Sequence, residues 1–278
     1  MADKQDAINT SCSTGNEPGA PSATLKPTAL ELTEYRSNHP RRGKAIIINQ
    51  RNFHPRLQQS EREGTDVDAE ALADVFQHLG FDVERYDNLT STDMSMTMRR
   101  ISKEDHTDAD CFACIILSHG EEGRVFSTDG RVYIEHITKN FKGDECPTLA
   151  GKPKLFFIQA CRGSKFDWGV EVDEPDAAIE GPSLRKIPME ADFLMAYSVV
   201  PGYFSWRNNI DGSWFIQALC RVFQQHGATM ELTNMMTLIN KVVAFDFESC
   251  TDEEFTSNMK QVPCFASTLT KLVFFRSK

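Results

Sequence analysis

Two short apolar runs, each followed by polar residues and a glycine, constrain the fold of this chain most strongly. Residues 111–117 are apolar throughout and lead to Ser118-His119-Gly120, and residues 154–159 contain a similar run that leads to Cys161-Arg162-Gly163. Such runs are typical of strands buried on both faces of a parallel sheet. In open sheets of this class, functional residues lie beyond the carboxyl ends of the strands. We therefore expect His119 and Cys161 to lie side by side if the two strands are neighbours.

The rest of the chain alternates between strand and helix patterns, which predicts an α/β fold with a mostly parallel sheet. One helix follows Gly64, with Thr65 as the expected N-cap, Asp68 as its capping-box partner and Gly80 at its end. Its expected apolar face is Val67, Leu72, Val75, Phe76 and Leu79. Asp129-Gly130 predicts a hairpin turn. The expected strands are residues 45–48, 81–86, 111–117, 154–159, 192–199 and 262–275, and the other expected helices are residues 92–102, 134–141, 214–225 and 232–243.

Composition excludes several classes of protein. The net charge of −10 and the pI near 5.2 argue against a nucleic-acid-binding surface, which needs a basic face. The first thirty residues hold no apolar stretch that could be a signal peptide, and no apolar run is long enough to span a membrane. Eight cysteines in 278 residues, several inside apolar runs, are typical of reduced thiols. We expect a soluble cytoplasmic protein that binds neither nucleic acid nor membrane.

A metal site is not expected. Cys111 and Cys114 form a C-x-x-C pair, but no second pair follows at the spacing of a zinc site. On a strand, their side chains would also face opposite ways. No cofactor is expected either.

Cys161 and His119 each have a structural and a catalytic interpretation. A cysteine after a strand is usually a small buried hydrophobic residue, and a histidine at a strand end is usually a surface residue. A catalytic cysteine needs a neighbouring base, because the thiolate is the nucleophile and a free thiol is mostly protonated at neutral pH. Both residues follow a strand and both are followed by a glycine, so the pair favours a nucleophile with its base.

The segment Gln159-Ala160-Cys161-Arg162-Gly163 resembles the nucleophile signature of caspases. Other segments resemble caspase landmarks in the same order over residues 42–275. The short unstructured N-terminal segment resembles that of executioner caspases, the apoptotic effectors. The matching segments are Asn52-Phe53-His54, Gly64-Thr65-Asp66-Val67-Asp68, Leu117-Ser118-His119-Gly120-Glu121-Glu122-Gly123, Ala191-Asp192-Phe193-Leu194, Ser205-Trp206-Arg207-Asn208 and Asp211-Gly212-Ser213-Trp214-Phe215.

This resemblance implies a six-stranded, mostly parallel sheet flanked by helices, and a cysteine endopeptidase that cleaves after aspartate at DEVD-like sites. Cys161 would be the nucleophile, and His119 would protonate the leaving amine and later activate water. The backbone N–H groups of Gly120 and Cys161 would hold the oxyanion. A backbone carbonyl near Ser60 would orient the imidazole.

The resemblance also implies the residues that select the substrate. Arg62 and Arg207 match the positions that bind the aspartate carboxylate, with Gln159 as a polar third wall. Near residues 250–252 the family places aromatic side chains, and this chain has none before Phe255, so its preference beyond the fourth substrate position stays open. Other expected substrate contacts are Phe204, Ser205, Trp206 and Phe255 around the next pocket, and Asn208 and Trp214 for an acidic residue four positions before the cut.

The segment at about residues 163–188 is acidic, and it contains no basic residue between Lys165 and Arg185. Loops of this length in compact domains are usually functional. Asp173-Glu174-Pro175-Asp176 itself has the pattern of a substrate, and the small Ala177 follows it. We expect the main processing cut after Asp176, a second one after Asp173, and a further one after Asp6. The chain would then divide into a disordered tail (residues 1–38), a large subunit (39–176) and a small subunit (177–278).

The implied partners are protein substrates with exposed Asp-x-x-Asp sequences, an upstream initiator protease and a second large–small pair, joined through the last strand as a homodimer. Inhibitor-of-apoptosis-type proteins are further candidates.

Three alternative functions would each require residues other than those present. A relative that cuts after basic residues would need acidic residues in place of Arg62 and Arg207. A silent homologue acting as scaffold or decoy would usually lack Cys161, His119 or a pocket arginine. A nucleotide-binding protein would need a glycine-rich phosphate loop, which is absent.

Overall fold

The central element is a six-stranded sheet. The computed structural model describes residues 31–163, 191–208, 210–249 and 257–278. The chain divides into two units, Met1–Glu31 and Leu32–Lys278, and the elements below belong to the second. The strand order is β11-β8-β7-β3-β1-β2. The strands β1, β2, β3, β7 and β8 are parallel to one another, and β11 is antiparallel to β8. The mostly parallel sheet that the sequence predicts is therefore confirmed. Its strands are β1 (Lys44–Asn49), β2 (Asp82–Asp87), β3 (Phe112–Leu117), β7 (Lys154–Gln159), β8 (Phe193–Tyr197) and β11 (Cys264–Ser267).

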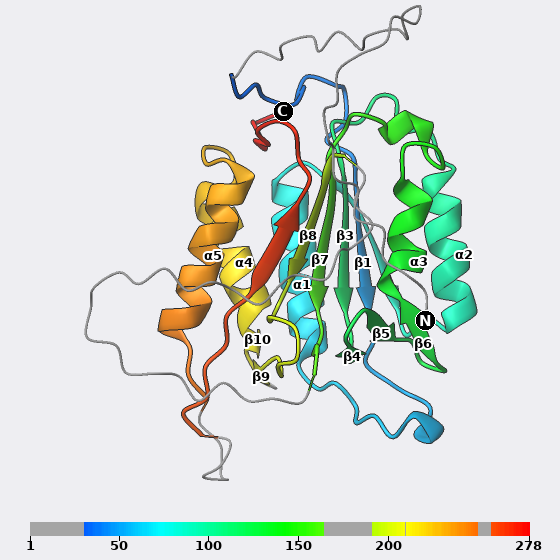
Figure 1. Cartoon of the computed structure of the whole chain (residues 1–278), viewed down its shortest axis with the longest axis vertical. Coiled ribbons are helices and arrows are strands. Elements are labelled where there is room, and N and C mark those ends of the chain that lie inside the picture. Colours follow the sequence, from blue (N-terminus) through cyan, green and yellow to red (C-terminus); the bar gives the residue numbers. More distant parts are fainter. Residues whose placement is uncertain (1–30, 164–190, 209, 250–256) are drawn as a thin grey trace, which may run out of the picture. The chain divides into compact units, whose positions relative to one another are not determined.

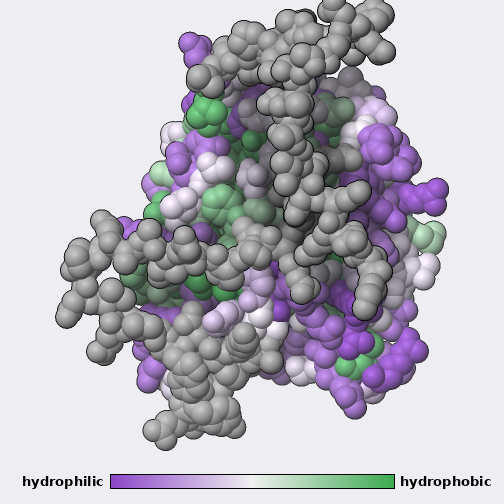
Figure 2. Space-filling view, in the orientation of Figure 1, coloured by the Kyte–Doolittle hydropathy of each residue, from purple (hydrophilic) through white to green (hydrophobic). Residues whose placement is uncertain are grey.

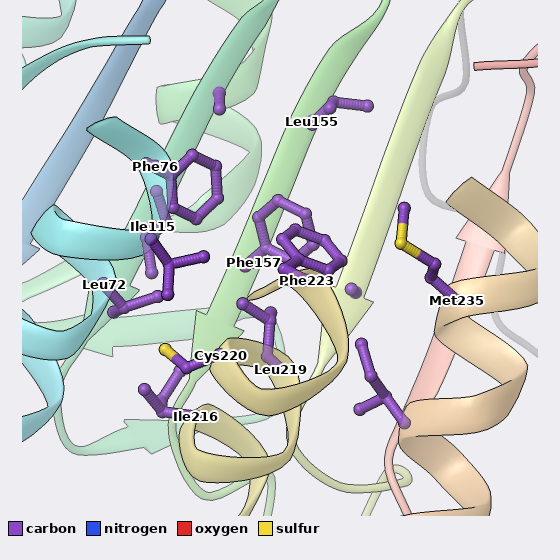
Figure 3. Close-up of a cluster of buried hydrophobic side chains, with 14 of the residues drawn as sticks. Leu72, Phe76, Ile115, Leu155, Phe157, Ile216, Leu219, Cys220, Phe223 and Met235 are labelled. Carbon is purple, nitrogen blue, oxygen red and sulfur yellow. The ribbon is translucent and has the colours of Figure 1, made fainter. Parts of the chain in front are cut away.

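The central strands are apolar because both faces of the sheet are covered. Along β3, Ala113, Ile115 and Leu117 join one core cluster, and Phe112, Cys114 and Ile116 join the other. Figure 3 shows part of the first cluster, where Phe157 of the sheet lies between Phe76 and Phe223, with ring centroids 6.0 and 5.8 Å away. Cys111 and Cys114 fall in opposite clusters, as expected for a strand, so they do not form a paired site.

Five α-helices of the described chain cover the two faces (Figure 1). The helices α1 (Thr65–His78), α4 (Trp214–His226) and α5 (Leu232–Asp246) pack on the first cluster, and α2 (Ser91–Ser102) and α3 (Ile134–Thr138) pack on the second. Met94, Met98 and Ile101 form the buried face of α2. Figure 2 shows that the flank over α2 and α3 is mainly hydrophilic, which fits helices with one apolar face.

The start of α1 differs from the expectation. Gly64, at φ 78°, occupies the N-cap position without a side-chain hydrogen bond, and Thr65 is the first helical residue. The Thr65 hydroxyl donates to Asn49 and accepts from Arg62, so it is used beneath the candidate site and not as a cap. Asp68 accepts hydrogen bonds from Ser213 instead of closing a capping box, and Val67 is 42% exposed.

Short elements flank the carboxyl ends of the central strands. The expected turn at Asp129-Gly130 joins β5 to β6, which confirms that prediction. A second small sheet pairs β9 with β10. These elements are β4 (Gly120–Glu121), β5 (Arg124–Phe126), β6 (Arg131–Tyr133), β9 (Arg207–Asn208) and β10 (Gly212–Ser213), and the 3₁₀ turns are η1 (Pro55–Leu57), η2 (Lys139–Phe141) and η3 (Pro147–Leu149).

Both ends of the folded unit depart from the sequence prediction. The last strand spans only Cys264–Ser267, because the following chain leaves the sheet so that Val273 and Phe275 pack in the first core cluster. The backbone of Leu272 pairs with Thr33 and Tyr35, and the buried Tyr35 hydroxyl donates to Asp192 over 2.5 Å. Residues 33–35 thus make backbone contacts with the folded part, although they precede the expected boundary at residue 38. In the described chain, no helix is long and apolar enough to cross a membrane.

Candidate active site

The strand register places the cysteine opposite the histidine. β3 and β7 are parallel neighbours with Leu117 opposite Gln159, and the backbone N–H of Ser118 donates to Gln159 over 3.0 Å. His119 lies two residues after Leu117, and Cys161 lies two residues after Gln159. The carboxyl ends of these strands lie at the bottom of the sheet in Figure 1, beside β4, β9 and β10.

A cleft of about 780 Å³ opens at this end of the sheet. It brings together His119, Gly120 and Cys161 with the predicted pocket residues Arg62 and Arg207. Segments from four regions of the chain form it. The complete lining is Gln58, Gln59, Ser60, Arg62, Ser118, His119, Gly120, Gln159, Ala160, Cys161, Gly163, Phe204, Ser205, Trp206 and Arg207.

The His119 ring is fixed by two contacts. Its Nε2 lies 2.8 Å from the Ser60 carbonyl oxygen, as the sequence-based interpretation expected, and its ring centroid is 4.9 Å from that of Phe53. Nε2 must carry the proton to donate to this carbonyl, which leaves Nδ1 as the proton acceptor of the neutral ring. Burial, aided by the charges of Arg62 and Arg207, lowers the pKa of His119 to about 4. The imidazole is therefore a neutral base at physiological pH.

The Cys161 thiol lies against the backbone of Ser205. Its Sγ is 3.5 Å from the Ser205 nitrogen, which donates to it, and 4.0 Å from the Ser205 carbonyl. Burial raises the pKa of this thiol, whereas the Ser205 hydrogen bond and the nearby guanidinium groups oppose that rise. Without substrate, the cysteine is a neutral thiol beside a neutral imidazole.

Gly120 is required by close packing. A Cβ at this position would lie 2.7 Å from the Cys161 carbonyl oxygen and 2.8 Å from the Ala160 Cβ, closer than real Cβ contacts. The backbone of residue 120 therefore runs directly against the backbone of the cysteine. This approach is compatible with two N–H groups serving one oxyanion, as the sequence-based interpretation expected.

Arg62 and Arg207 form an unusual pair of cations. Arg62 is 1% exposed; its NH1 donates to the Gln50 carbonyl and to the Thr65 hydroxyl, and its Nε has no hydrogen-bond partner. Arg207 donates from Nε to the Glu63 carbonyl. Burial and the charge of Arg207 lower the pKa of Arg62 to about 9, and burial also lowers the pKa of Arg207. Among the described residues, no carboxylate lies within ion-pair distance of either guanidinium.

Gln159, expected as a polar third wall, lines the same cleft as the two arginines. Its Nε2 donates to the Ser205 hydroxyl over 2.8 Å, and its buried Oε1 has no hydrogen-bond partner. Unsatisfied buried polar atoms are rare in proteins and commonly mark a binding site. The cleft thus presents two guanidinium groups and an amide to an incoming anionic or polar group.

The comparisons with known proteins agree with this geometry. Residues 42–274 match the family model described as the caspase domain. The chain is 50% identical over 246 residues to caspase-7 of Gallus gallus, covering 87% of this chain and 80% of the relative. It is 46% identical over 249 residues to caspase-3 of Bos taurus, covering 89% and 90%. A crystal structure of caspase-1 from Spodoptera frugiperda superposes with a TM-score of 0.82 at 40% identity, covering 91% of this chain and 97% of the other.

The chain belongs to the caspase family. It is an aspartate-specific cysteine endopeptidase, and its similarity to caspase-7 and caspase-3 makes it an executioner-type apoptotic hydrolase. The cleft at the end of β3 and β7 is the place in this caspase where a thiol, an imidazole and the guanidinium groups of the buried Arg62 and the partly buried Arg207 come together.

Aromatic side chains border the caspase cleft on one side. Phe204 and Trp206 line it, with ring centroids 5.3 Å apart. Trp206 stacks on Trp214, and Trp214 stacks on Phe247, at 5.8 and 5.6 Å. Trp214 is itself buried and does not line the cleft. It supports Trp206 from behind.

Asn208 also lies outside the lining of the cleft. Its Oδ1 accepts from the backbone nitrogens of Ile210 and Asp211, so in this structure it holds the turn between β9 and β10. The roles of Asn208 and Trp214 toward an acidic residue four positions before the cut stay predictions. Phe255, the departure at residues 250–252, and the processing sites Asp6, Asp173 and Asp176 lie outside the described residues.

Sequence reasoning missed several residues of the site. Gln58 and Gln59 line the cleft, and Phe53 packs on the histidine, although Phe53 stood inside a matched segment. Asp68, which the sequence predicts at a helix cap, instead joins α1 to β10 near Arg207, and its carboxylate accepts from the Ser213 nitrogen over 2.8 Å. The position of this acidic residue inside a matched segment was the signal in the sequence that could have indicated a role at the site. No cluster of metal-ligating side chains occurs in the described chain.

Proposed function

We propose that this caspase cuts proteins after the second aspartate of Asp-x-x-Asp sequences, with Cys161 as nucleophile and with Arg62, Arg207 and Gln159 holding the aspartate carboxylate. One observation carries this proposal. The guanidinium groups of the buried Arg62 and the partly buried Arg207 line the same cleft as the thiol and the imidazole, and neither forms an ion pair with a carboxylate of the described residues. A substrate carboxylate would supply the charge that the pocket lacks, in the planar geometry that guanidinium groups favour.

The chemistry follows from the two neutral groups. The thiol gives its proton to Nδ1 of His119 as Sγ of Cys161 attacks the carbonyl carbon, because Nε2 is held by the Ser60 carbonyl. The imidazolium then protonates the leaving amine, and the neutral ring later takes a proton from the water that cleaves the acyl-enzyme. The backbone N–H groups of Gly120 and Cys161 hold the oxyanion, each worth about 3–4 kcal/mol.

Release of a fluorophore from an Asp-Glu-Val-Asp peptide tests this assignment. The matched peptide ends in Asn, which removes only the charge, and Cys161→Ala is the enzyme control. Fast cleavage of the Asp peptide alone supports both the nucleophile and the arginine pocket. Equal rates on the two peptides would mean that the pocket is misassigned.

We further propose that the chain is made as a zymogen and cut in its acidic linker, mainly after Asp176 and second after Asp173, to give the large (39–176) and small (177–278) subunits. Asp6 in the tail has the same pattern, with aspartate at the first and fourth positions. The support is the match between these segments and the proposed substrate pattern. Mass spectrometry of the active enzyme should find new amino termini at Ala177, and an active chain that stays intact across residues 173–177 would refute the proposal.

The assembly proposal rests on the edge of the sheet. β11 is the last strand of the sheet and pairs only with β8 among the described strands. We propose that its free side pairs with a second copy, giving a homodimer of large–small units, because an open strand edge offers unpaired backbone groups. Cytoplasmic protein substrates and an upstream initiator protease would be its partners, with inhibitor-of-apoptosis-type proteins as further candidates. Sedimentation of the cleaved enzyme tests the dimer.

A further inference from the structure

A side chain remote from the cleft holds the loop that fixes His119. Asn88 follows β2 and has a left-handed backbone, with φ 55°. Its Oδ1 accepts two hydrogen bonds, from the backbone nitrogen of Arg51 over 2.9 Å and from that of Asn52 over 2.8 Å. One amide oxygen thus fixes two consecutive peptide groups at the start of the loop formed by residues 50–62.

This loop provides both contacts that hold the histidine ring. Phe53, directly after the two fixed peptide groups, packs its ring on His119 at 4.9 Å and 50°. Ser60, later in the same loop, accepts from Nε2 of His119. A second anchor follows, because the backbone nitrogen of His54 donates to the Thr128 carbonyl over 2.7 Å.

We propose that Asn88 is a positioning residue for catalysis, which acts through Phe53 and Ser60 to keep the His119 imidazole in place for proton transfer. The proposal rests on the proposed role of His119. It adds to that role a residue at the end of a different strand, with no contact to substrate. Displacement of a catalytic group by about 1 Å can reduce the rate about a hundredfold.

The guanidinium of Arg62 is held by contacts that do not involve Asn88, although the backbone nitrogen of Arg62 donates to the Arg51 carbonyl over 3.0 Å, in the peptide group that Asn88 fixes. Substrate binding should therefore change less than turnover. Arg62 is fixed by the Gln50 carbonyl and the Thr65 hydroxyl, and Gln50 is itself an extension of the sheet, since its nitrogen donates to Leu117 over 2.8 Å. Loss of the Asn88 hydrogen bonds should therefore lower kcat about ten- to a hundredfold while KM changes less than about threefold.

Burial of His119 gives a second, independent readout. The titratable groups that face it in the cleft are Arg62 from the loop, Arg207 from β9 and Cys161 from the segment that follows β7. Because burial is the main cause that lowers the pKa of His119, a loop that opens should let water reach the ring and move its pKa up, toward 6.5. A purely structural role of Asn88 would leave this pKa unchanged in the folded protein.

Two substitutions separate the hydrogen bonds from the backbone conformation. Asn88→Gly allows the left-handed backbone without steric strain but removes the acceptor, and Asn88→Asp keeps an acceptor at the same place. Both are made in the full chain and processed like the parent enzyme, and kcat and KM are measured with the Asp-Glu-Val-Asp peptide. We expect the kcat loss in Asn88→Gly and recovery of most of the activity in Asn88→Asp. Parental kcat in Asn88→Gly, or equal losses in both variants, would overturn the proposal.

Titration of His119 by NMR keeps the test independent of substrate. In the Cys161→Ala background, Asn88→Gly and Phe53→Leu should each raise the pKa of the His119 ring relative to the single variant, and Asn88→Asp should not. If the ring titrates identically in all four proteins, Asn88 does not act through the histidine. If the parent enzyme fails to cleave the peptide while these shifts occur, the proposed function fails and the positioning role stands.

Discussion

Two buried arginines lie on either side of β1, and they differ in whether a carboxylate pairs with them. Arg42, before the strand, is 2% exposed, and Arg62, in the loop after it, is 1% exposed. Arg42 donates to the Asp110 carboxylate over 3.0 Å, to the Leu79 carbonyl over 3.2 Å and to the Arg276 carbonyl. Asp110 also binds His39 and Lys278. At this end of the strand, the buried charge is fully compensated by the protein.

Among the described residues, Arg62 makes no ion pair of this kind, and the carboxylates of Asp68 and Asp66 favour its charge only through longer-range electrostatics. Arg62 has two neutral oxygen acceptors, an Nε without a partner and a second guanidinium as its neighbour. Keeping a buried charge in this state costs free energy. The difference between the two sites indicates where function lies. The complete network joins residues 39, 42, 110, 276 and 278 to one another, whereas the incomplete one is the network that we propose a substrate carboxylate completes.

The largest effect should follow from Arg62→Met. Each charge-assisted hydrogen bond to the substrate contributes about 1.5–3 kcal/mol, so the loss of two should lower kcat/KM on the Asp-Glu-Val-Asp peptide about a hundred- to ten-thousandfold. Stability should not fall by more than about 1 kcal/mol, because an uncompensated buried charge is removed. Peptide kinetics and urea unfolding on the same preparations measure both. An unfolding free energy that drops by several kcal/mol would erase the contrast with Arg42.

The matched variant, Arg42→Met, should lower the free energy of unfolding and leave the activity nearly unchanged. Removing one partner of a buried ion pair costs about 3–5 kcal/mol, and the lower end applies because Asp110 keeps Lys278 and His39. The kcat/KM of the folded enzyme should stay within about twofold of the parent, since Arg42 lies at the opposite end of β1 from the cleft. Urea unfolding at neutral pH gives the stability change, and a large loss of activity without a loss of stability would contradict it.

The stability of the protein should also depend on pH through His119, which lies in the cleft with Arg62. Burial lowers the pKa of His119 from 6.5 to about 4. Between these values the unfolded chain binds a proton that the folded chain does not, so the His119 contribution to stability falls as the pH is lowered from 6.5 to 4. His119→Asn should therefore lose less stability than the parent between pH 7 and pH 5. Parallel losses in chemical unfolding at both pH values would show that His119 is not the group responsible.

The smallest effect on stability is expected at Lys278, the partly exposed member of the Arg42–Asp110 network. Lys278 is partly exposed and bonds Asp110 over 2.7 Å. Because a partly exposed ion pair contributes little, Lys278→Ala should reduce the free energy of unfolding by about 0.5–1 kcal/mol and leave peptide cleavage unchanged. A loss as large as that of Arg42→Met would mean that the C-terminal residue, and not the buried guanidinium, compensates Asp110.

Patterns local in the sequence predicted most of the fold. The apolar runs at residues 111–117 and 154–159 are strands, and the Met94, Met98 and Ile101 stripe is a buried helix face. The predictions that failed at the start of α1 depended on partners outside the helix. Thr65 is drawn to Asn49 and Arg62, and Asp68 is drawn to Ser213, 145 residues away, so neither serves the cap that the local pattern favoured.

The sequence by itself determined the chemistry of this protein: a cysteine, a histidine and two arginines inside recognisable segments, and strands whose parallel pairing puts the first two at one end of the sheet. Only the tertiary structure decided which charges are compensated. Arg42 and Arg62 look alike in the sequence, and they differ because folding brings Asp110 to the first and Arg207 to the second. Such pairings depend on contacts across more than sixty residues, and the pattern around either arginine holds no record of them.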